Sequence, residues 1–142
     1  MSRLRLLRRE DGQAMVEFAM VLPILVVLLL GIVQFGIIFN NYETMTDAAR
    51  VGARQAATSR LSGDAGTLGK AAVYAAATNL NASDLNVDVS SCAPGTYPCS
   101  TQDWLTTGNE VTVKATYPYS INILDFTVAS GTLTTITKER LE

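Results

Sequence analysis

The chain has 142 residues, enough for one modest domain, and a formal net charge of −2, so no basic excess suggests a nucleic-acid partner. It contains no histidine, which removes the commonest general base and a frequent zinc ligand. No spacing of serine, lysine or carboxylate residues suggests a catalytic site, so we expect neither an enzyme nor a bound metal or other cofactor.

A basic leader is predicted over residues 1–12. It contains four arginines and ends at Gly12, five residues before Glu17. Glu17 stands at the start of an apolar stretch, where a carboxylate is costly unless something compensates its charge. The compensation is either the helix macrodipole with lipid headgroups, or the N-terminal amine of a neighbouring subunit. The glycine and the basic leader together favour the second reading, which is a role in assembly.

The stretch from Phe18 to Tyr42 contains 25 residues without a charge. About 20 apolar residues cross a bilayer as a helix, so we predict a transmembrane helix over residues 13–41. Pro23 removes one helix hydrogen bond and is expected to permit bending. Gln34, a polar residue deep in the span, is expected to bond either to a neighbouring helix or to its own backbone.

The orientation follows from the arginines before the span, which favour a cytoplasmic N-terminus and an extracytoplasmic C-terminal domain. Arginines shortly after the span weaken this bias. The apolar run exceeds that of a secretory signal and ends without a small-residue cleavage site. We therefore expect the helix to stay in the mature protein.

A helical stalk is predicted over residues 42–62, ending before Gly63-Asp64-Ala65-Gly66. Small residues recur along it at helical spacing, which lets two helices approach closely. The predicted helix-packing residues are Ala48, Ala49, Gly52, Ala53, Ala56 and Ala57.

A small extracytoplasmic head is predicted over residues 63–142. A second helix is expected from about Thr67 to Leu80. From Leu85 the pattern alternates with period two, with Leu85, Val87 and Val89 inward and Asn86, Asp88 and Ser90 outward, which is typical of a half-buried strand.

Two further strands complete the expected head. One follows the turn Thr107–Glu110, with Val111, Val113, Ala115 and Tyr117 on one face, and Pro118 is expected to end it or to place it at an edge. The other covers Thr127–Thr137. These elements predict an α+β fold, with a long N-terminal helix, a short second helix and a small three-stranded antiparallel sheet.

The two cysteines, Cys92 and Cys99, flank a loop with two prolines and a glycine. In an extracytoplasmic domain this pair predicts a short disulfide, whereas in the cytosol it predicts two free thiols. The expected topology favours the disulfide.

The first third of the chain resembles a known family. Residues 10–23, EDGQAMVEFAMVLP, closely resemble the start of TadE-like proteins, which are minor pilins or pseudopilins of the Tad (Flp) branch of type IV pili. Residues 31–36, GIVQFG, and 47–54, DAARVGAR, look like the same family. The resemblance covers roughly the first 57 residues.

The resemblance implies that a prepilin peptidase cuts on the cytoplasmic side between Gly12 and Gln13. It makes Glu17 the family's glutamate, and Phe18 stands where relatives often have tyrosine. The implied partners are the peptidase, other pilin and minor-pilin subunits, the Tad inner-membrane assembly platform and the lipid bilayer. The implied locations are the cell membrane and an extracellular pilus.

An alternative from another class is an uncleaved single-pass membrane protein that displays a small extracytoplasmic binding domain. Gly12 and Glu17 separate the two hypotheses, because a simple anchor needs neither residue.

Overall fold

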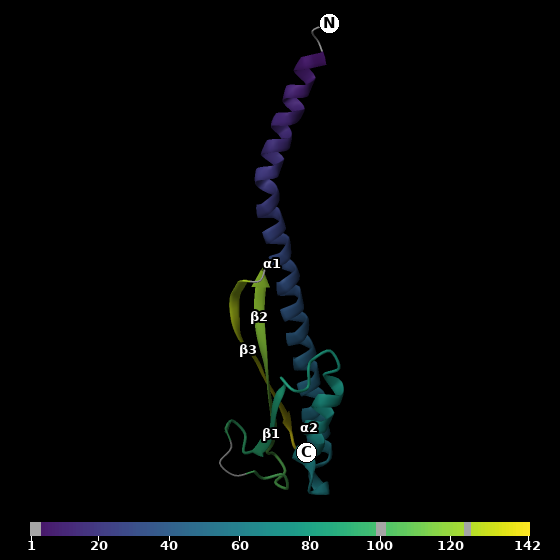
Figure 1. The fold of residues 1–142 in the computed structure, drawn as a ribbon. Coiled ribbons are helices and arrows are strands. Elements are labelled where there is room, and N and C mark those ends of the chain that lie inside the picture. Colours follow the sequence, from purple (N-terminus) through teal and green to yellow (C-terminus); the bar gives the residue numbers. More distant parts are fainter. Residues whose placement is uncertain (1–3, 99–101, 124–125) are drawn as a thin grey trace.

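A computed structural model describes the backbone of residues 4–98, 102–123 and 126–142, and the side chains from residue 12 onward within these ranges. The elements in chain order are α1 (Leu4–Thr58), a short 3-10 helix η1 (Arg60–Ser62), α2 (Ala65–Ala76), β1 (Asn86–Cys92), β2 (Glu110–Ile123) and β3 (Phe126–Arg140). Figure 1 shows a long helix whose C-terminal half carries a small head. The predicted α+β fold is confirmed.

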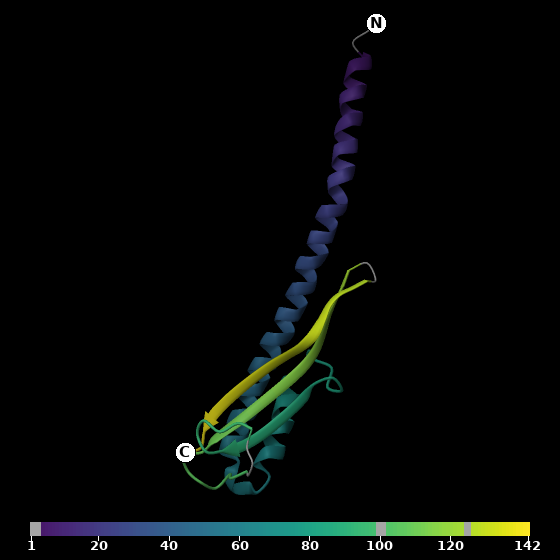
Figure 2. The same ribbon diagram turned by 90° about the vertical axis from the view of Figure 1, so that its left-hand side faces the viewer.

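α1 is one continuous helix of 55 residues that runs from the leader into the head. Its N-terminal part is apolar and none of its most hydropathic stretch is buried, so the helix is long and apolar enough to cross a membrane. Pro23 lies inside the helix, which continues through it and curves gently along its length (Figures 1 and 2). The predicted span and stalk are therefore parts of one helix.

The sheet has the order β1-β2-β3 with both pairs antiparallel. β1 pairs with β2 from Cys92 opposite Glu110 to Asn86 opposite Thr116. Beyond Thr116, β2 pairs only with β3, and the two strands continue as a two-stranded ribbon. We call this ribbon, residues 117–123 and 126–133, the hairpin arm. It runs back along α1 toward the apolar half of the helix (Figure 2).

Pro118 does not end its strand, so that part of the sequence prediction is wrong. β2 continues to Ile123, five residues further. Because β1 stops opposite Thr116, the strand has one open side at Pro118, and proline is tolerated where a strand has a free edge. The alternative expectation, that Pro118 lies at an edge, is thus correct: β2 is a central strand up to Thr116 and an edge strand beyond it.

The core lies between the sheet and the two helices. The inward residues of the predicted alternation, Leu85, Val87 and Val89, are buried. α2 is shorter at its C-terminal end than predicted, and β3 is longer at both ends. The largest fully buried side chains of the core are Met45, Val73, Val111, Val113 and Leu141.

Ser90 departs from the predicted alternation. It lies on the outer face of the sheet, yet its exposed fraction is only 4%. The loop after β1 folds back over this face: Gly95 N–H donates to Glu110 at 3.4 Å, and Tyr97 lies beside Asp88. Burial, aided by the Asp88 carboxylate, raises the pKa of the Tyr97 hydroxyl. The sequence pattern did not reveal that this loop covers the sheet.

Candidate functional site: the N-terminal helix and its junction with the head

The predicted processing and assembly residues lie on the exposed first turns of α1. Gln13 Nε2 donates a hydrogen bond of 3.1 Å to Glu17 Oε1, one helical turn away. An added Cβ at Gly12 would meet no atom within 4 Å in the described part of the chain. Packing therefore does not require glycine at position 12, and the Glu17 carboxylate lies close to the residue that cleavage would expose.

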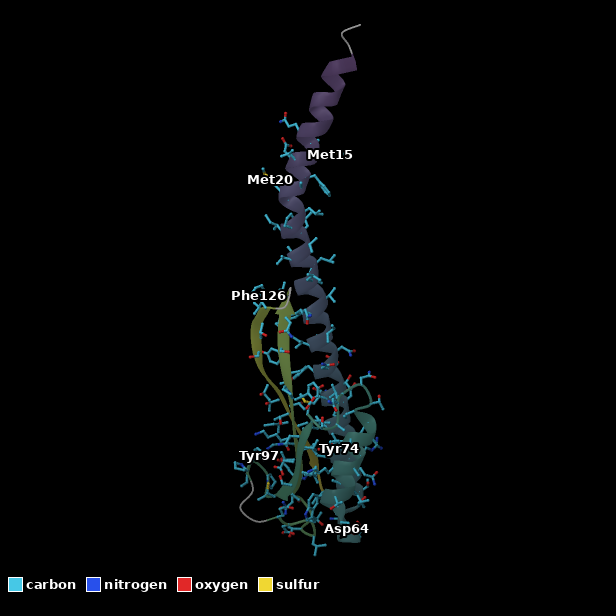
Figure 3. The ribbon with its side chains drawn as sticks, viewed as in Figure 1. Met15, Met20, Asp64, Tyr74, Tyr97 and Phe126 are labelled. Carbon is cyan, nitrogen blue, oxygen red and sulfur yellow. The ribbon has the colours of Figure 1, made fainter. Side chains whose placement is uncertain are left out.

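The helix beyond these residues is apolar around its circumference and exposed. Phe18, Met20 and the leucines from Leu22 to Leu29 are all exposed, and Figure 3 shows Met15 and Met20 projecting from α1 far from the head. A helix with no polar face is stable in lipid or among other apolar helices. This exposed apolar surface of α1 is therefore expected to contact lipid or other apolar helices and not water.

This exposed, apolar helix with its N-terminal glycine and glutamate matches a known family. Residues 12–54 match the model of the TadE-like protein family. The TadE-like segment begins at Gly12 and includes Glu17, Phe18 and Pro23. It confirms the resemblance found in the sequence, and with the membrane-length helix it indicates a membrane-associated protein related to the Tad pilus.

The head lies outside the TadE-like segment. Neither the curated proteins nor the solved structures contain a significant match to this chain.

The small residues at the end of the TadE-like segment pack inside the head. Gly52 faces Gly69 of α2, where an added Cβ would lie 2.8 Å from the Gly69 carbonyl oxygen. The predicted helix-packing alanines are buried, except Ala57, which is half-buried. The structure places these residues against α2 and the sheet of the same chain, and not on a free surface.

Two carboxylates in the head stabilise loops. Asp103 accepts bonds from the Thr106 hydroxyl and from the backbone N–H of Leu105 and Thr106, and these bonds lower the pKa of its carboxyl. Glu110 accepts from Lys138 Nζ at 3.1 Å and from Gly95 N–H, which likewise lowers its pKa. Each carboxylate is thus hydrogen-bonded to groups of its own loop or neighbouring strand, and its bonds order the local backbone.

The described residues test neither the predicted disulfide nor, beyond their own side chains, a metal site. Cys92 is buried at the end of β1, but its predicted partner Cys99 lies outside the described residues, so the disulfide stays a prediction. Within the described residues, no group of three or more Cys, Asp or Glu side chains is placed to hold a metal ion.

Gln34 has a partner that the sequence did not predict. Its Nε2 donates a 3.2 Å hydrogen bond to the carbonyl oxygen of Asn122, near the end of the hairpin arm. The sequence analysis offered a neighbouring helix or the local backbone, whereas within this chain the amide bonds to a strand instead. A contact between residues 88 positions apart gives no local signal in the sequence.

Proposed function

We propose that this chain is a minor pilin or pseudopilin that acts in the assembly of a Tad-type (Flp) pilus. The observation that carries the proposal is the TadE-like segment, which begins at Gly12 and continues as an exposed apolar helix. The role is structural and needs no catalytic group.

In this proposal a prepilin peptidase cuts between Gly12 and Gln13, and the helix is held in the membrane until assembly. Packing within the described chain does not account for the glycine at position 12, so the structure leaves this role open to it. The N-terminus is cytoplasmic and the head extracytoplasmic.

During assembly the apolar helix leaves the lipid and packs among the helices of sister subunits, with help from the inner-membrane assembly platform. Glu17 then compensates the N-terminal amine of a neighbouring subunit. Such a pair is stabilised in a low-dielectric environment and fixes the axial register of parallel helices. Within one chain, the Gln13 amide already donates to one oxygen of Glu17, and among the described residues the other oxygen has no hydrogen-bond donor.

Intact-mass and N-terminal analysis of the protein from its native membranes tests the proposal. We expect a chain that begins at Gln13, and we expect Gly12→Val to retain residues 1–12. The matched control is Gly31→Val, because Gly31 is also a glycine of α1 with nothing within 4 Å of an added Cβ in the described chain. A wild-type chain that keeps its leader would refute processing and favour the uncleaved membrane anchor.

A further inference from the structure

The hairpin arm reaches the membrane-spanning part of α1. In Figures 1 and 2 the far end of the arm reaches the level of the middle of the helix, well away from the rest of the head. The Gln34–Asn122 hydrogen bond fixes this level. Half-buried positions recur on one face of α1 at helical spacing, at Leu30, Gln34, Ile38 and Asn41, whereas neighbouring positions such as Phe35 are exposed.

The level of the tip can be compared with the bilayer. A hydrocarbon core of about 30 Å takes about 20 helical residues, so a span that begins after Glu17 ends near Ile37. Gln34 then lies roughly 5 Å inside the outer boundary, at 1.5 Å per residue. Because Asn122 of the arm contacts Gln34, this part of the arm lies at the level of the outer edge of the same bilayer.

The arm has the composition of a surface that meets lipid. Between Lys114 and Lys138 the sequence carries a single charged residue, Asp125, which lies outside the described residues. Phe126 and Val128 have exposed fractions of 78% and 64%, and Figure 3 shows Phe126 at the far end of the arm. Exposed apolar side chains on an unpaired strand edge are a liability in water. Aromatic side chains are favoured at a membrane interface.

The depth of insertion is limited by the backbone. β2 and β3 form a two-stranded ribbon here, so in the described residues the outer edge of each strand has backbone N–H and C=O groups without a strand partner, although the Asn122 carbonyl accepts from Gln34. Such groups cannot enter the hydrocarbon core without water, but they are hydrated among lipid headgroups. The arm therefore fits a shallow position within roughly 5 Å of the hydrocarbon boundary, where water and headgroups still reach its strand edges.

We propose that Phe126 and Val128, at the described start of β3 in the hairpin arm, insert into the outer leaflet of the bilayer that α1 spans. The proposal goes beyond the proposed function, although it rests on the membrane span and on the outward position of the head. The lipid contact is a second attachment to the membrane, and it holds the head against the bilayer surface while the subunit is stored.

Tryptophan fluorescence in vesicles tests this insertion. The full chain is reconstituted into phosphatidylcholine–phosphatidylglycerol vesicles whose acyl chains carry bromine, which quenches tryptophan on contact. The natural Trp104 is replaced by phenylalanine, and single tryptophans are introduced by Phe126→Trp, Leu28→Trp or Thr134→Trp. Leu28 reports on insertion of α1, and Thr134 lies at the head end of the arm, opposite Thr116.

We expect emission from Phe126→Trp to fall about twofold or more, because an interfacial side chain lies about 5–10 Å into the boundary between headgroups and acyl chains. Emission from Thr134→Trp and from Trp104 in the wild type should change little. Quenching of Leu28→Trp without quenching of Phe126→Trp would overturn the proposal and leave the membrane span intact. A blue-shifted but unquenched Phe126→Trp emission would show a protein partner at the tip, and would overturn it too.

Discussion

Gly52 of α1 and Gly69 of α2 face each other at a close contact between the two helices, which the Ala56 and Val73 side chains flank. A Cβ at Gly69 would lie 3.0 Å from the Gly52 carbonyl oxygen and 2.7 Å from the Ala56 Cβ. A Cβ at Gly52 would overlap Val73 Cγ2 and approach the Gly69 carbonyl oxygen. This close approach joins the membrane helix to the head.

Gly52→Ala should destabilise the head by about 1–3 kcal/mol, because the added methyl group overpacks a fixed backbone contact. In an unconstrained helix the same change stabilises by up to about 1 kcal/mol, so the sign identifies the close contact. Urea unfolding of the full chain in detergent, followed by Trp104 fluorescence, measures the free energy. Gly36→Ala is the control, since an added Cβ there meets nothing within 4 Å in the described chain. Equal stability of both variants would refute the close helix contact.

Two adjacent buried serines should differ in their contribution to stability. Ser91 Oγ donates a 2.6 Å hydrogen bond to the Asp103 carbonyl oxygen, so Ser91→Ala should cost about 1 kcal/mol. Ser90 lies opposite Thr112, and neither hydroxyl has a hydrogen-bond partner among the described residues. Ser90→Ala should therefore be neutral or stabilising. Thermal unfolding of the two variants compares them directly, and a larger loss for Ser90→Ala would contradict this assignment.

Stability should decline in acid partly through Glu110. Its pKa is lowered in the folded state, so its contribution is present above the unfolded value of about 4.3 and is lost as the pH falls through the folded pKa. Glu110→Gln should flatten the fall in the free energy of unfolding between about pH 5 and pH 3.

Lys138→Met removes the partner of Glu110 and should flatten the same part of the pH profile, because Lys138 is the largest cause of the lowered pKa. The double variant should add little to either single change, since the two residues act as one pair. Full additivity of the two effects would refute this pairing.

Glu17→Gln should leave membrane insertion and cleavage intact but impair packing with sister subunits. An unpaired charge in low dielectric costs about 3–5 kcal/mol, so recovery of the subunit in crosslinked assemblies should fall by at least about tenfold. Glu43→Gln, at the other end of the uncharged stretch, is the control, because Glu43 is exposed beside the head. Similar assembly of both variants would argue against a role for Glu17 in subunit packing.

The sequence predicted the features that depend on local pattern. The uncharged stretch predicted a membrane-length helix, and the alternation of Val87 and Val89 predicted a strand with one buried face. Both signals arise within one element and need no knowledge of its neighbours. The TadE-like segment was recognised for the same reason, since its glycine, glutamate and apolar run lie close together in the chain.

Contacts between distant segments were not predictable. The small residues around Gly52 indicated a close helix contact, but not that α2 of the same chain supplies it through Gly69. The burial of Ser90 depends on a loop that folds back over the sheet. The Gln34–Asn122 bond forms because β2 and β3 extend well beyond the end of β1. The sequence did not predict this extension, because Pro118 was expected to end β2 or to place it at an edge.

Because α1 is one continuous helix, a change in its tilt within the membrane is transmitted directly to the head. From Gly12 to Thr58 the helix has 47 residues, which corresponds to about 70 Å at 1.5 Å per residue. With the close contact at Gly52 preventing independent movement of the head, a change of about 10° in helix tilt moves the far end by roughly 12 Å, well within the range of tilts that membrane helices adopt. Small adjustments of the helix within the bilayer are thereby converted into large displacements of the head.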